Sequence, residues 1–143
     1  MNLKKSFLNL CENKEYEINE NQISIVEKLS EYYNLNFNKS LIKKIFKDKN
    51  KKSGFYLVGD VGVGKTMILN FFFDLLKEKK YRLHFNEFMI KFHEFIFENK
   101  KKGENQGLEK FVEKLSDKTQ ILYFDEFQVT NIADAMILGK LFK

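Results

Sequence analysis

The stretch Gly59-Asp-Val-Gly-Val-Gly-Lys-Thr66 decides the fold class, because it fits the pattern G-x-x-x-x-G-K-[ST] at every fixed position. This pattern describes a phosphate-binding loop that joins a buried strand to a helix. An apolar run predicts the strand at residues 55–58, and helical periodicity predicts the helix at residues 66–78. The dinucleotide-binding pattern G-x-G-x-x-G fails, because Met67 stands where the third glycine is needed.

The spacing within this loop suits a triphosphate. Glycines allow the backbone to turn through positive φ, so we expect this at Gly59, Gly62 and Gly64. Successive N–H groups would then form an anion-binding nest at the positive end of the following helix. The lysine would reach the β- and γ-phosphates, and the threonine hydroxyl would bind Mg²⁺. The predicted nucleotide-binding residues are Gly59, Asp60, Val61, Gly62, Val63, Gly64, Lys65 and Thr66.

A second apolar run, residues 121–124, predicts a strand at residues 120–124 that is followed by two adjacent acids, Asp125 and Glu126. In NTPases with a phosphate-binding loop, an Asp at the end of such a strand helps to hold Mg²⁺. We therefore predict Asp125 and Thr66 as magnesium ligands. Glu126 would polarise the attacking water, so Glu126 and Lys65 are the predicted catalytic residues. The predicted cofactors are ATP and Mg²⁺.

Strands that alternate with helices predict an α/β fold, with a parallel sheet covered by helices on both faces. The strands are expected at residues 55–58, 81–85 and 120–124. A helix at 66–78 is expected after the first strand, and helices at 87–99 and 108–116 after the second. A further helix is expected to start at Asn131, with Asp134 in its first turn.

The part before the loop has a different character. Apolar periodicity predicts a helix at residues 18–34, with Asn19 as its N-cap and Gln22 as its third residue. A shorter helix is expected at 39–47, followed by a basic linker. The predicted domains are therefore an N-terminal helical segment with its linker, residues 1–53, and the N-terminal part of a P-loop ATPase domain, residues 54–143.

Composition limits the class of protein. The chain has 143 residues, of which 43% are hydrophobic and 31% charged, as in a globular domain with a core. No apolar run approaches the roughly 20 residues of a membrane span, and no signal peptide is recognisable. The single cysteine, Cys11, excludes an internal disulfide. We therefore expect a cytoplasmic protein.

The net charge of +5 does not indicate a specific nucleic-acid partner, because Arg82 is the only arginine among the 25 basic residues. Proteins that read nucleic acids rely on the bidentate contacts of arginine. The many Lys, Asn, Ile and Phe residues are typical of AT-rich coding sequence. A weak attraction to phosphate or to an anionic membrane surface stays open.

Three segments, 56–67, 82–89 and 124–138, resemble the ZapE cell-division ATPases, bacterial relatives of a mitochondrial inner-membrane ATPase. The sequence Asp-Glu-Phe-Gln-Val-Thr that begins at Asp125 is the most specific part. The resemblance covers residues 18–143 and is weaker around Gln22. It implies an AAA-like P-loop fold, with residues 59–66 as Walker A and Asp125 and Glu126 as Walker B.

The resemblance also implies that Arg82 and His84 are family features, to which it assigns no role. Asn131 stands where the family more often has Asp, and Asp60 where it more often has Gly. Neither difference is expected to prevent nucleotide binding.

From the resemblance we expect a Mg²⁺-dependent ATPase that acts on a protein partner at the division site or inner membrane. It allows a homo-oligomer and peripheral membrane association. Its members continue into a sensor strand and an arginine finger, so we expect this chain to be an N-terminal fragment. Two alternatives stay open: a nucleotide-binding fragment without turnover, and a nucleic-acid-coupled ATPase such as a helicase loader.

Overall fold

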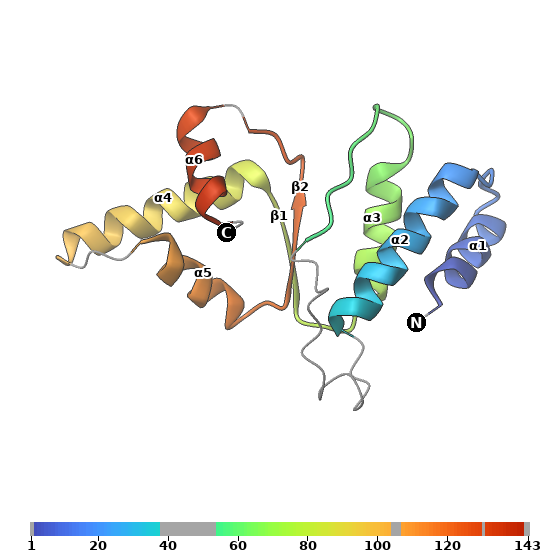
Figure 1. Cartoon of the computed structure of the whole chain (residues 1–143), viewed down its shortest axis with the longest axis horizontal. Coiled ribbons are helices and arrows are strands. Elements are labelled where there is room, and N and C mark those ends of the chain that lie inside the picture. Colours follow the sequence, from blue (N-terminus) through green and yellow to red (C-terminus); the bar gives the residue numbers. More distant parts are fainter. Residues whose placement is uncertain (1, 38–53, 104–106, 130, 142–143) are drawn as a thin grey trace. The chain divides into compact units, whose positions relative to one another are not determined.

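The computed structural model describes residues 2–37, 54–103, 107–129 and 131–141. The chain divides into two compact units, Met1–Leu75 and Leu76–Lys143. Figure 1 labels the helices and strands of both units. The helix predicted at residues 39–47 lies outside the described residues. The predicted domain boundary after residue 53 stays a prediction.

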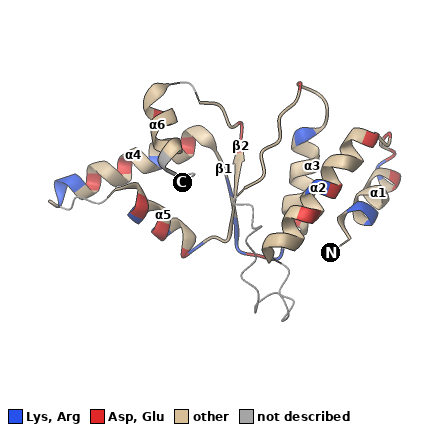
Figure 2. Cartoon of the chain, in the orientation of Figure 1, with Lys and Arg blue, Asp and Glu red and all other residues tan. Residues whose placement is uncertain are grey.

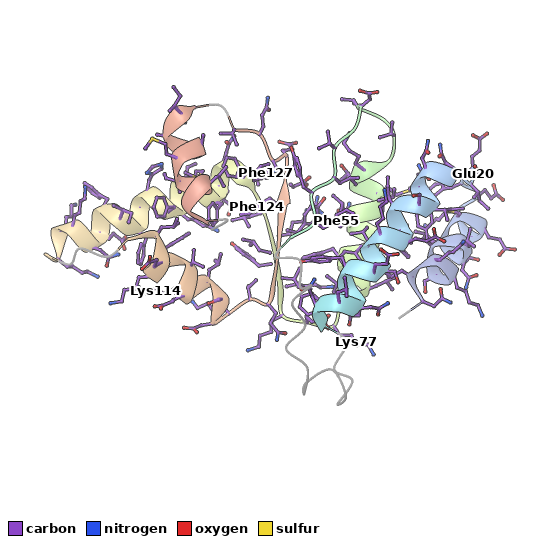
Figure 3. All side chains as sticks on the ribbon, in the orientation of Figure 1. Glu20, Phe55, Lys77, Lys114, Phe124 and Phe127 are labelled. Carbon is purple, nitrogen blue, oxygen red and sulfur yellow. The ribbon has the colours of Figure 1, made fainter. Side chains whose placement is uncertain are left out.

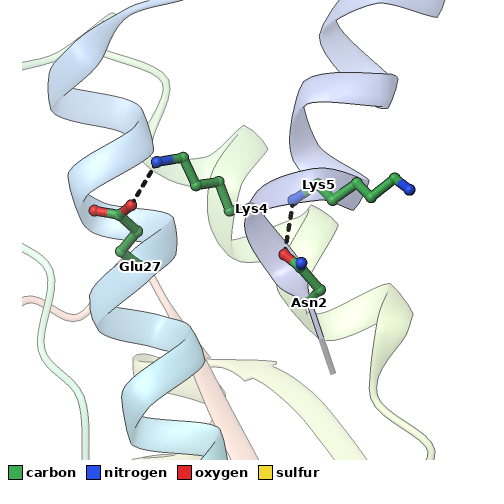
Figure 4. Close-up of polar contacts among 4 residues, drawn as sticks. All are labelled: Asn2, Lys4, Lys5 and Glu27. Atoms are coloured by element: carbon green, nitrogen blue, oxygen red, sulfur yellow. Dashed lines mark hydrogen bonds and ion pairs between the residues drawn. The ribbon is translucent and has the colours of Figure 1, made fainter.

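No prediction covers helix α1, Leu3–Asn13, which opens the first unit. The helix buries the side chains of Leu3, Phe7 and Cys11. These side chains recur every four residues, which is the spacing of one helical face. Asn2 caps the helix, since its Oδ1 accepts a hydrogen bond from Lys5 N at 3.1 Å (Figure 4). The pattern that indicates this helix is therefore present in the sequence.

Helix α2, Glu20–Phe37, confirms the helix predicted at residues 18–34. Asn19 is its N-cap as predicted, because Asn19 Oδ1 accepts a hydrogen bond from Asn21 N at 2.9 Å. Helix α3, Lys65–Leu75, is the helix predicted after the loop, although it ends three residues earlier than residue 78.

The three helices of this unit bury one apolar core. Its buried residues are Leu3, Phe7, Cys11, Val26, Leu29, Ile68 and Phe72. The rings of Phe7 and Phe71 meet edge to face, with centroids 5.2 Å apart. Lys4 and Glu27 join α1 to α2 through an ion pair of 2.7 Å (Figure 4). Both charged side chains are about half exposed, so the buried apolar face contributes more to stability than this ion pair.

The strand predicted at residues 55–58 is wrong, because residues 54–60 form neither helix nor strand. A strand requires a ladder of hydrogen bonds to a neighbouring strand. The sheet of the described residues contains only Lys80–His84 (β1) and Ile121–Asp125 (β2). Phe55, labelled in Figure 3, packs its ring near α2 instead. Its ring centroid lies 6.1 Å from that of Tyr32.

The second unit is built on the parallel pair β1–β2, which confirms the predicted parallel arrangement. Its helices are α4 (Phe85–Lys101), α5 (Leu108–Ser116) and α6 (Ile132–Leu141). In the register of the pair, Arg82 lies opposite Tyr123, and His84 lies opposite Asp125. The carboxyl ends of both strands therefore meet at one edge.

The two faces of this strand pair differ. Leu83 and Phe124 are register partners on the face that packs against the helices. Phe124 lies in a cluster of rings, with centroids 4.9 Å from Phe88 and 5.9 Å from Phe127 (Figure 3). The alternation of a strand directs Arg82, Tyr123 and Asp125 to the opposite face. We expected a sheet covered by helices on both faces, but all five residues of β2 are only half-buried. Only β1 pairs with it in the described sheet.

Charged residues of both signs are interspersed along α1, α2 and α4 (Figure 2). None of the helices in the described ranges is long and apolar enough to cross a membrane.

Candidate functional site

The loop of residues 59–66 has the backbone turns that its glycines predict at two positions. Gly62 has φ +87° and Gly64 has φ +83°, a region that residues with a Cβ avoid. The prediction is wrong for Gly59, which does not have a positive φ. A Cβ at Gly59 would lie 3.6 Å from Val63 Cγ2, an ordinary contact. The tight turn of the loop therefore depends on Gly62 and Gly64.

Lys65 is the first residue of α3, and its side chain turns back over the loop. Its Nζ donates hydrogen bonds to Gly59 O, at 2.5 Å, and to Asp60 O. These bonds hold a positive charge close to the N-terminus of α3, where unpaired N–H groups already carry partial positive charge. Thr66, the next residue, is exposed in the first turn. This arrangement suits the binding of a phosphate group.

A residue outside the motif also contacts the loop. Gln22 is the third residue of α2, and its Nε2 donates a hydrogen bond to Val63 O at 3.2 Å. A Cβ added to Gly64 would lie 2.7 Å from the same nitrogen. We expected Gln22 only as part of the helix start. Nothing in its local pattern indicates this contact, which joins residues 41 positions apart.

The acid pair lies at the end of β2, as predicted. Asp125 is the last residue of the strand and Glu126 follows it directly. Arg82, from the middle of β1, donates a hydrogen bond from Nη2 to Asp125 Oδ2. The guanidinium also lies over the ring of Tyr123, with Cζ 5.0 Å from the ring centroid. At this edge of the sheet, the carboxylate of Asp125 is therefore paired with Arg82.

These contacts change the acidity of two groups. The hydrogen bond from Arg82 lowers the pKa of the Asp125 carboxyl, and the charge of Arg82 and the backbone N–H of Glu126 lower it further, against the effect of burial. Burial raises the pKa of the Tyr123 hydroxyl, and the negative charge of Asp125 adds to that rise. Asp125 is therefore ionised at neutral pH, as a magnesium ligand must be.

Glu126 has an unusual backbone, with φ +51°. A residue other than glycine in this region costs about 1–3 kcal/mol and is often found at functional sites. Its side chain is 82% exposed, and its Oε2 lies 3.8 Å from Nδ1 of His84. The strand ends at Asp125, and the Glu126 carboxylate that follows it is accessible to water.

The residues predicted to hold Mg²⁺ fit that ion chemically. A threonine hydroxyl and a carboxylate are hard oxygen ligands. The carboxylate of Asp125 that would contribute to this site accepts a hydrogen bond from Arg82 at Oδ2. Within the described ranges, no three His, Cys, Asp or Glu side chains gather as a metal site. In NTPases with a phosphate-binding loop, a magnesium ion takes one hydroxyl and one Asp from the protein, and phosphate oxygens supply further ligands.

The structure brings the eight loop residues together in the unit Met1–Leu75, and Asp125 and Glu126 together in the unit Leu76–Lys143. Asn131 and Asp134 form the helix start that we predicted. Asn131 Oδ1 accepts from Asp134 N at 2.8 Å, and Asn131 Nδ2 donates to Asp134 Oδ2 at 2.7 Å.

Comparison with known proteins shows the family of this chain. The family model of the AFG1-like ATPases matches residues 1–143, so the chain belongs to the AFG1-like ATPase family. It is 42% identical over 91 residues to "Cell division protein ZapE" of Escherichia coli K12. It is 37% identical over 100 residues to "Lactation elevated protein 1 homolog B" of Danio rerio. No solved structure matches it significantly.

The alignments cover 63% of this chain but only 24% of the Escherichia coli protein and 20% of the Danio rerio protein. The chain therefore spans a minor part of the length of the curated relatives that it matches. The resemblance to the ZapE-like ATPases expected from the sequence is confirmed.

Proposed function

We propose that this chain supplies the nucleotide-binding loop and the acidic residues of a Mg²⁺-dependent ATPase that acts on a protein partner. The observation that carries the proposal is the loop of residues 59–66. Two glycines with positive φ and the ammonium of Lys65 are held together at the N-terminus of α3. The family supports ATP as the nucleotide, since its members are ATPases.

Each residue has a role in the proposed reaction. Lys65 and the loop N–H groups bind the β- and γ-phosphates, and Thr66 and Asp125 hold Mg²⁺. When bound, Mg²⁺ neutralises charge on the phosphate oxygens. Glu126 accepts a proton from the attacking water, for which its exposed carboxylate is suited. The proposal that both sets of residues serve one nucleotide rests on the two motifs and on the family.

The partner is proposed to be a protein at the division site or inner membrane. The support is the name of one relative, "Cell division protein ZapE". We propose a cytoplasmic location, which is compatible with peripheral association with the membrane and with a homo-oligomer.

Lys65→Ala in the full chain tests nucleotide binding most directly. Removing a charged group that contacts phosphate should weaken ATP binding by about 10- to 100-fold. The matched control is Lys28→Ala, which removes an exposed lysine of α2 in the same unit. Isothermal titration calorimetry with ATP and Mg²⁺ measures both variants. Equal affinity of Lys65→Ala and the wild type would contradict the proposal.

Glu126→Gln separates binding from turnover. The variant should keep ATP affinity, because the amide retains the shape of the side chain, and should lose turnover by about 100-fold or more. Glu113→Gln, an exposed change in α5, is the control. Phosphate release by the two variants and the wild type gives the comparison. Wild-type turnover by Glu126→Gln would remove the role proposed for Glu126.

A further inference from the structure

The contact of Gln22 with the phosphate-binding loop has a consequence for nucleotide binding. Gln22 comes from α2, a helix that precedes the motif by more than 20 residues and is not part of it. Its amide touches the loop at two successive residues: Nε2 donates to Val63 O at 3.2 Å and occupies the space beside Gly64. These are the residues immediately before Lys65.

The position of Gln22 is fixed independently of the loop. Asn19 caps α2, so the first turn of the helix is defined three residues before Gln22. Further along, the helix buries Val26 and Leu29 in the core that it shares with α1 and α3. Because α3 begins at the end of the loop, the loop lies between two helices that pack in one core.

The chemistry of the side chain distinguishes glutamine from glutamate here. At the third position of a helix, Glu and Gln serve equally well in a capping box, through an acceptor oxygen. Only Gln also has an NH₂ group that can donate to a carbonyl. An ionised Glu at this position would place a second oxygen against Val63 O and a negative charge beside a phosphate-binding loop.

We infer that Gln22 is a positioning residue of the nucleotide site, which holds Val63 and Gly64 in the conformation that binds phosphate. The N-terminal helical segment thereby takes part in nucleotide binding. The effect that this inference predicts on ATP affinity rests on the proposed function. The effect that it predicts on the order of the loop does not.

The test compares Gln22→Glu and Gln22→Ala with the wild type and with Asn21→Ala, an exposed change in the same helical turn. The first measurement is the ¹⁵N relaxation order parameter of the Gly64 amide in the full chain without nucleotide. We expect a fall from about 0.85 towards 0.6 in both Gln22 variants, and no change in Asn21→Ala. Gln22→Glu should leave thermal stability unchanged, because Glu is favourable in a first helical turn.

The second measurement is ATP affinity by calorimetry, which should fall about three- to tenfold in both Gln22 variants. A wild-type order parameter for Gly64 in Gln22→Glu would overturn the inference. A mobile loop with unchanged affinity would overturn it as well, because the contact would then have no effect on binding. If the wild type itself failed to bind ATP, the proposed function would fall, while the order parameter would still decide the role of Gln22 in the loop.

Discussion

Arg82 contacts the carboxylate of Asp125 and the ring of Tyr123 on one face of the strand pair. Its guanidinium compensates the charge of Asp125. A bound magnesium ion would supply positive charge to the same carboxylate, so Arg82 and Mg²⁺ both favour the ionised form.

Arg82→Gln should raise the pKa of Asp125 towards that of an ordinary Asp, since the largest cause of its depression is the hydrogen bond from Arg82. A ¹³C titration of the side-chain carboxyl measures the change. Arg82→Lys keeps the positive charge but loses the planar guanidinium. In this variant, the pKa of Asp125 should lie between the values in the wild type and in Arg82→Gln. An unchanged pKa in Arg82→Gln would contradict the assigned cause.

The same shift predicts how stability depends on pH. Because the pKa of Asp125 is lower in the folded state, the Arg82–Asp125 pair stabilises the fold at pH values above the pKa of an unfolded Asp, near 3.8. The contribution is lost as the pH falls through the lower, folded value. In denaturant unfolding, Asp125→Asn should therefore lose less stability than the wild type between pH 5 and about pH 3. An equal loss in both proteins would count against the pair.

The backbone of Glu126 allows a third residue-level prediction. At φ +51° a glycine is tolerated and an alanine is strained. Glu126→Gly should be more stable than Glu126→Ala by about 1 kcal/mol, although both lack the carboxylate. Urea unfolding of the two variants gives the difference directly. A more stable Ala variant would show that this turn is not under strain.

Among the site residues, the sequence could predict those that belong to contiguous motifs, namely residues 59–66 and the pair Asp125–Glu126. Chemistry and spacing fix these locally. The contacts of Gln22 and Arg82 join residues 41 and 43 positions apart. Such contacts depend on how helices and strands pack against one another, which a local sequence pattern does not predict.

At the scale of elements, the start of α6 is set by Asn131, which bonds with Asp134 in both directions. Asn131→Ala removes this cap and should lower the free energy of unfolding by about 1 kcal/mol. Asn131→Ser retains an oxygen that can cap the helix and should lose much less. Thermal unfolding followed by circular dichroism ranks the three proteins. Equal stabilities would mean that the start of α6 frays without consequence.

Helices with clear periodicity and polar flanks were predictable, and α5 has the predicted bounds, Leu108–Ser116. The failures have physical causes. The segment of residues 55–58 has the apolar character of a strand, but it is not paired in the described sheet, which contains only β1 and β2. Helix α1 shows its pattern only in the four-residue spacing of Leu3, Phe7 and Cys11.

At the scale of the whole molecule, the two motifs belong to different compact units of the chain. Local structure explains how each is built: the loop by its glycines and by Gln22, and the acid pair by the end of β2 and by Arg82. From the two motifs and the family, we propose that both serve one nucleotide through a shared magnesium ion.

The most direct measurement is the effect of Mg²⁺ on ATP affinity, in the wild type and in Asp125→Asn. In the wild type, we expect Mg²⁺ to strengthen binding to the loop. Asp125→Asn should bind ATP without Mg²⁺ about as well as the wild type, and should gain little when Mg²⁺ is added. Calorimetry with and without the metal gives all four values. If Mg²⁺ strengthened ATP binding equally in both proteins, Asp125 would not hold the metal and the proposal would be contradicted.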